Sequence, residues 1–196
     1  MFQYCTDIDL TYNQQPILKS INLKPQRVIP FTKIEKVNEY DQIVYFENDP
    51  QFFDELWNNF DKYTKKISKF LAVIQPDFCP FDIKRDFPLK ILEYENLRSR
   101  LMAQEWQKQD INVIPTAIFG KEKGNYVYNA VMEGLPEKST YAFQINGINS
   151  ENINDFEAGL KVILHMYKPV NFLFIGSEIN FSFNLKNYVD YVFLIP

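Results

Sequence analysis

Cysteine and histidine are scarce in this 196-residue chain, which contains two cysteines and one histidine. The cysteines, Cys5 and Cys79, stand far apart, and no CxxC pair occurs. Disulfide scaffolds and Cys/His zinc sites need several such residues at short, regular spacings, so neither is expected here. The scarcity of cysteine agrees with a reduced, intracellular compartment.

Long apolar runs are absent as well. No segment approaches the roughly 18 to 20 consecutive apolar residues of a membrane-spanning helix. The N-terminal stretch MFQYCTD shows neither the basic region nor the apolar run of a signal peptide. We therefore expect a cytoplasmic protein with no membrane contact.

An excess of positive charge is also missing. Lys and Arg number 21 against 25 Asp and Glu, which gives a formal net charge of −4. General nucleic-acid binding is not expected, because it depends mainly on the neutralisation of phosphates by Lys and Arg. The sequence also lacks P-loop, GxGxxG, GxSxG and HExxH motifs, so no cofactor is indicated and an enzymatic role stays undecided.

What the chain does contain is an alternation of short apolar runs with amphipathic segments. This order predicts one α/β domain over 41–196 with a mainly parallel sheet, either open or in a partial barrel-like arrangement. Residues 1–40 carry three prolines and are expected to form an irregular arm packed on that body, with one or two edge strands. Strands are predicted at 43–46, 71–75, 111–120, 140–145 and 172–177, with a final edge strand within 181–196, and helices at 50–70, 89–109 and 154–168.

Asp77 stands directly after one of these predicted strands. The apolar run 71–75 stops at Pro76, which is typical of a buried strand that delivers the next residue to its carboxyl end. Ligands of α/β proteins bind at that end, so Asp77 is a candidate catalytic base or metal ligand. The alternative is that Asp77 caps the turn after the strand by accepting backbone N–H bonds. Other polar residues follow the strands and are predicted to converge there: Asn48, Asp49, Thr116, Asn146, Ser177 and Glu178.

Two arginines in the predicted helix 89–109 are candidates for holding an anionic group such as phosphate. Guanidinium groups bind oxyanions through paired hydrogen bonds, and Asn96 stands close by. Arg98 and Arg100 lie about 200° apart around a helix, so they cannot both point into one site unless the helix begins late or bends. One of them is therefore predicted to be a surface or ion-paired arginine.

Several short segments occur in a distinctive order along the chain. They are Tyr45-Phe46 through Asp49 to Leu56-Trp57, Val73-Ile74 with Pro76-Asp77-Phe78, Asn96-x-Arg98-x-Arg100, Val113-Ile114-Pro115, Gly134-Leu135-Pro136, Asn146-Gly147 and Ile175-Gly176. Their ordered combination resembles an uncharacterised family, the domain of unknown function numbered 4417, over roughly residues 40 to 180. Asp110, Phe119 and Cys79 stand where the family pattern often has glycine, tryptophan and serine.

The resemblance implies a phage or mobile-element accessory protein, which would act in the cytoplasm of the host cell. It implies a polar site at Asp49, Asp77, Asn96, Arg98 and Arg100 but no known reaction. Two hypotheses follow. In the first, the protein binds a host or defence-system protein, and its 18 phenylalanines and 12 tyrosines supply interface anchors. In the second, it binds or hydrolyses a small anionic ligand, such as a nucleotide, at the strand ends.

Overall fold

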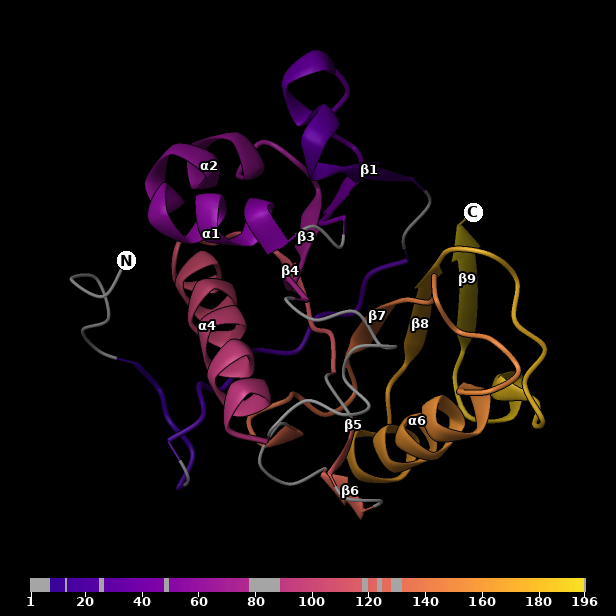
Figure 1. Ribbon diagram of the computed structural model, residues 1–196. Helices are drawn as coiled ribbons and strands as arrows, with labels where there is room; N and C mark the ends of the chain where they lie inside the picture. The colour runs from indigo at the N-terminus through magenta and orange to yellow at the C-terminus, as the bar shows by residue number, and fades with distance from the viewer. Residues whose placement is uncertain are drawn as a thin grey trace.

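The computed structural model describes residues 8–12, 14–24, 27–47, 50–77, 89–117, 120–122, 125–127 and 132–195. Parallel strands form two sheets with helices between them, which confirms the predicted α/β fold (Figure 1). The first sheet has the strand order β1-β2-β3-β4, and the second has the order β7-β8-β9. The strands are β1 (Val28–Pro30), β2 (Ile43–Tyr45), β3 (Ala72–Ile74), β4 (Val113–Ile114), β7 (Thr140–Gln144), β8 (Asn171–Ile175) and β9 (Tyr191–Ile195), and β5 (Gly120–Glu122) forms an antiparallel hairpin with β6 (Asn125–Val127).

The two parallel sheets share one apolar interior. A backbone hydrogen bond of 3.0 Å from Ala142 N to Pro115 O links the middle of β7 to the residue after β4. Side chains alternate between the two faces of a strand. Those on the inner faces, such as Ile74, Ile114 and Leu173, form a single buried cluster to which both sheets contribute. The arrangement is therefore barrel-like, with β1 and β9 as its two outer strands.

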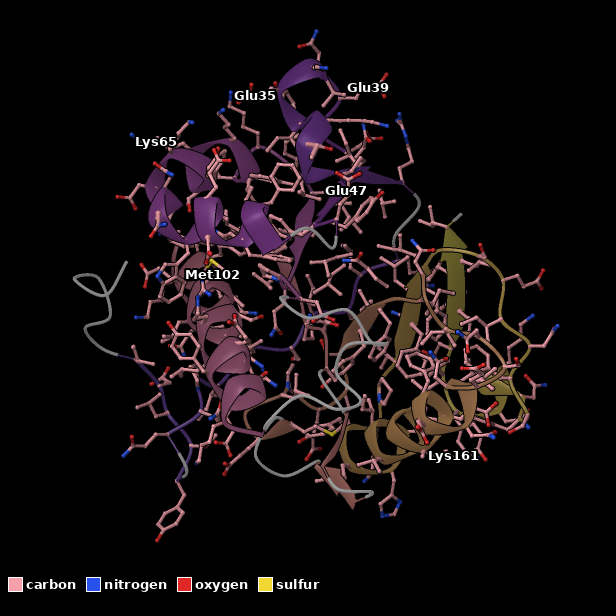
Figure 2. The ribbon with its side chains drawn as sticks, viewed as in Figure 1. Glu35, Glu39, Glu47, Lys65, Met102 and Lys161 are labelled. Carbon is pink, nitrogen blue, oxygen red and sulfur yellow. The ribbon has the colours of Figure 1, made fainter. Side chains whose placement is uncertain are left out.

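Helices cover the outer faces of the sheets (Figure 1). The helices α1 (Pro50–Asn58), α2 (Phe60–Ile67) and α4 (Leu89–Lys108) pack on the first sheet around Trp106, which is fully buried. Met102 lies where α4 passes close to α1 and α2 (Figure 2). The helix α6 (Ile153–Tyr167) packs on Phe143, Phe172 and Phe174 of the second sheet.

Two details of the predicted helices were wrong. The segment 50–70 is not one helix, because the backbone of Asn59 leaves the helical region at φ −118° and ψ 35° and separates α1 from α2. The third helix begins at Ile153 rather than after Asn154. Its N-cap residue is Asn152, whose side chain binds the preceding turn through Gly147 O and Asn149 N.

The N-terminal segment 15–24, which we call the strap, runs along α4 and then across the start of β7. The side chain of Gln107 exchanges two hydrogen bonds with the backbone of Lys19. Further on, Ile21 and Leu23 are hydrogen-bonded to Ser139 and Thr140, the residues at the start of β7. The side chains of Ile21 and Leu23 pack against the inner cluster. The strap therefore covers the amino ends of the strands, opposite the end at which a ligand site is predicted.

Candidate functional site

A buried polar network supports the carboxyl end of β3. Gln75 is 1% exposed and donates from Nε2 to Ser99 Oγ at 2.8 Å. Its Oε1 accepts from the backbone N–H of Thr116 at 3.3 Å, which ties the ends of β3 and β4 together. Ser99 Oγ in turn donates to Pro76 O. These bonds fix the backbone just before Asp77, which is half-buried at the same edge.

The other predicted rim residues differ in their surroundings. Asn146 follows β7 in a turn and is exposed, with its side chain facing Gly176 at the end of β8. Thr116 is buried. Asn48 and Asp49 lie outside the described residues. Because β3, β4, β7 and β8 are parallel to their neighbours, Asp77, Thr116 and Asn146 share one edge of the fold.

Arg98 points away from that edge and toward α1. Its Nη2 donates to Asp54 Oδ1 at 2.6 Å, and its Nη1 lies 3.3 Å from Glu95 Oε2. The guanidinium also lies over the ring of Trp57, 5.1 Å from its centroid. Burial raises the pKa of Glu95, and the charge of Arg98 opposes that rise. Arg98 is thus the ion-paired arginine that helix geometry predicts for one of the two.

Arg100 is fully buried on another side of α4. Its Nη1 donates to Glu133 O at 3.2 Å, and the hydroxyls of Tyr141 and Tyr167 bind backbone carbonyls of the same segment, Pro136 O and Met132 O. Burial lowers the pKa of Arg100 to about 10, so the guanidinium stays charged at neutral pH. Asn96, one turn earlier, is also buried and donates to Gln15 Oε1 at 3.1 Å. Both side chains therefore hold neighbouring segments against α4.

The sequence analysis missed a hollow on the outer face of β9. It has a volume of about 380 Å³ and lies between β9 and the segment 178–186, and none of its lining residues belongs to α6. Its wall is mostly apolar, with Glu178 and Lys186 among its polar residues. The residues lining this β9 hollow include Ile145, Phe174, Ile179, Phe181, Phe183, Leu185, Val192 and Leu194.

A buried carboxylate holds the segment that forms the hollow. Glu157 on α6 is 4% exposed and accepts hydrogen bonds from both the backbone N–H and the hydroxyl of Ser182. Lys161, which is labelled on α6 in Figure 2, lies 3.8 Å from Glu157 Oε2 and over the ring of Phe183. Glu157 thereby anchors this segment to α6. The hollow is therefore bounded by fixed contacts to α6.

A family model described as Domain of unknown function (DUF4417) matches residues 7–192. The chain belongs to this family. The match extends beyond the range 40 to 180 on which the resemblance was based, so it includes the strap and the first two residues of β9 as well as the body.

Relatives of this DUF4417 member occur in phages. The Gene 1 protein of Mycobacterium phage D29 is 24% identical over 173 residues, which cover 83% of the chain and 62% of the phage protein. The Gene 1 protein of Mycobacterium phage L5 is 25% identical over 136 residues, or 68% of the chain and 57% of that protein. The chain thus spans about three fifths of the length of these curated relatives. No solved structure matches it.

Two kinds of feature are absent from the described parts of this DUF4417 chain. Those parts contain no group of three or more His, Cys, Asp or Glu residues that could hold a metal ion. They also contain no helix with the length and apolar character needed to cross a membrane.

Proposed function

We propose that this phage-associated protein acts by binding a host or defence-system protein. In this proposal an amphipathic helix of the partner places its apolar side chains in the β9 hollow. The observation that carries the proposal is the hollow itself. Leu194 remains 42% exposed at its edge, whereas the residues of the other strands that face outward are buried. Apolar hollows of this size accept the anchoring side chains of a partner.

The pattern of the fold argues for a helix as the occupant. The outer faces of the first sheet and of β7 and β8 are covered by α4 and α6, which pack their apolar stripes on the strands. The outer face of β9 presents the same kind of surface through Val192 and Leu194. An amphipathic helix with apolar residues spaced three and four apart would complete this layer.

The contacts of the two arginines also support partner binding over catalysis at the strand ends. Arg98 is engaged with Asp54 and Glu95, and Arg100 holds the segment around Glu133. An anion at the strand ends would have to compete with these contacts, and a buried guanidinium loses stabilisation when its partners are removed.

Affinity capture from a lysate of the host bacterium tests the proposal. The wild type should retain one protein in stoichiometric amount, and Ile179→Lys should lose it, because the charge would be buried against the partner. Met166→Lys is the matched control, since Met166 is an exposed apolar residue on α6. It lies nine residues from Glu157, or about 13 Å along the helix.

The melting temperature of each variant shows whether it has folded, and Ile179→Ser provides a milder change at the same position. A synthetic peptide with the sequence of an amphipathic helix from the captured protein should bind the wild type and should not bind Ile179→Lys. The proposal fails if a folded Ile179→Lys protein still captures the partner, or if the wild type retains nothing.

A nucleotide- or phosphate-binding role at the strand ends is the second candidate. It is favoured by the fixed backbone before Asp77 and by the position of the strap, which lies at the amino ends of the strands, opposite this site. A nucleotide at about one hundred times its dissociation constant should stabilise the fold by roughly 2.7 kcal/mol. That shift should be lost in Asp77→Ala. Equal melting temperatures with and without every nucleotide in the wild type would remove this candidate.

A further inference from the structure

One edge of β9, the edge that faces away from β8, is not paired with a strand in the described part of the chain. Its five residues, Tyr191–Ile195, pair in continuous parallel register with β8 and with no other described strand. An outer strand presents unpaired N–H and C=O groups, and proteins usually protect it with charge, proline, a bulge or shortening. The sequence YVFLI has no charge and no proline, its pairing has no bulge, and Tyr191 and Leu194 are 44% and 42% exposed.

The outer strand at the opposite end of the fold has such protection. The strand β1 is three residues long and ends in Pro30, which has no N–H to donate. Arg27, directly before it, forms ion pairs with Glu39 and Asp41. Asp190 and Pro196 flank β9 in a similar way, so the contrast lies within the strands: the five positions of β9 carry neither charge nor proline, which favours pairing along this edge.

The direction of the backbone groups identifies which residues would pair. Ile195 O accepts from Gly176 N at 2.9 Å, so the polar groups of Ile195 face β8. Because these groups alternate along a strand, those of Leu194 face the free edge. Leu194 therefore offers both a backbone donor and a backbone acceptor to an added strand.

We propose that the added strand is β9 of a second copy, paired antiparallel about a two-fold axis at Phe193. This edge is self-complementary, because the N–H and C=O groups of Val192 in one copy meet those of Leu194 in the other. Its lack of charge removes the like-charge repulsion that would oppose pairing of two identical strands. The proposal concerns the backbone edge of β9, whereas the partner proposal concerns the side chains that line the β9 hollow; Leu194 belongs to both, and Ile179 belongs to the hollow alone.

Oligomeric mass over a range of protein concentrations tests the dimer. Light scattering after size exclusion should show the wild type reaching twice the 23.3 kDa mass of the monomer at high concentration. Leu194→Pro removes the outward N–H without breaking the ladder to β8 and should remain monomeric. Met166→Lys, which leaves the edge intact, should dimerise like the wild type.

Cysteine cross-linking tests the register. Residue 193 would face its own copy as a non-hydrogen-bonded pair, whose Cα atoms lie about 4.5 Å apart and suit a disulfide. Phe193→Cys with Cys5→Ser and Cys79→Ser should therefore form a covalent dimer on oxidation, and Met166→Cys in the same background should not. A wild type that stays monomeric at every concentration, or a folded Leu194→Pro protein that still dimerises, would overturn the proposal. Ile179→Lys should dimerise normally, which separates this result from failure of the partner proposal.

Discussion

Replacing Arg100 by alanine is expected to lower the free energy of unfolding by about 4 kcal/mol, because truncating a long buried side chain leaves a cavity and orphans a buried acceptor. The side chain is fully buried beside Tyr141 and Tyr167, and the orphaned acceptor would be Glu133 O. Relief from burying the charge offsets part of this loss. Urea unfolding monitored by circular dichroism measures the change.

Arg100→Met is the control for this substitution. It keeps most of the volume and removes the charge, so its cost should stay below about 1.5 kcal/mol. Both variants remove the charge, and only Arg100→Ala removes most of the volume. The difference between their free energies of unfolding therefore measures the contribution of packing. If Arg100 instead held an anionic ligand, both variants would keep their stability and lose binding. Unchanged stability in Arg100→Ala would therefore contradict the structural role and return this arginine to the candidate site.

Gly134→Ala is expected to lower the free energy of unfolding by about 3 kcal/mol, since a residue with a side chain is strained at positive φ and the new atom would meet backbone. Gly134 has φ +84°, and a Cβ there would lie 2.5 Å from Pro16 O in the strap. The strap would have to move, which breaks the bond from Leu18 N to Gly134 O. Urea unfolding measures the cost, and faster hydrogen exchange at Leu18 would report the displaced strap.

Gly176→Ala is the matched comparison. Gly176 also has positive φ, at +134°, but the nearest atom to a new Cβ is the side-chain Oδ1 of Asn146. That side chain is exposed and can rotate away, which leaves the backbone N of Asn146 at 3.1 Å as the remaining close atom. The backbone contact at residue 134 is closer, at 2.5 Å, so Gly176→Ala should lose less stability than Gly134→Ala. Equal losses in the two variants would mean that backbone strain alone, rather than the strap, accounts for the cost.

The sequence was sufficient to predict the order of the parallel strands and the helices, because each of these strands is a short apolar run bounded by turn residues. The strand predicted at 111–120 was too long: β4 covers only Val113–Ile114, and Gly120 begins β5 of the antiparallel hairpin. It also predicted that Arg98 and Arg100 diverge, since helix geometry alone fixes that angle. It could not predict which arginine is ion-paired, because the answer depends on Asp54 of α1, 44 positions away. The break at Asn59 was missed because apolar spacing continues across it.

The candidate site also combines features that local sequence predicts with features that depend on distant residues. Asp77 follows from the end of an apolar run, which is a local pattern. The β9 hollow depends on Glu157 reaching Ser182, and on strand β9 returning beside β8, so no single stretch of sequence encodes it. The exposed aromatic and apolar residues of 181–196 were the available signal. They predicted an edge strand correctly but gave no indication of a concave surface.

The strap also sets an order of events during synthesis of the chain. Ile21 leaves the ribosome long before Ser139, its hydrogen-bond partner, which lies 118 positions later. At the usual rates of translation that interval is on the order of 10 s. During this time the strap has been synthesised but strand β7, on which it packs, has not. The strap therefore stays without its hydrogen-bond partners in β7 through most of the synthesis of the domain.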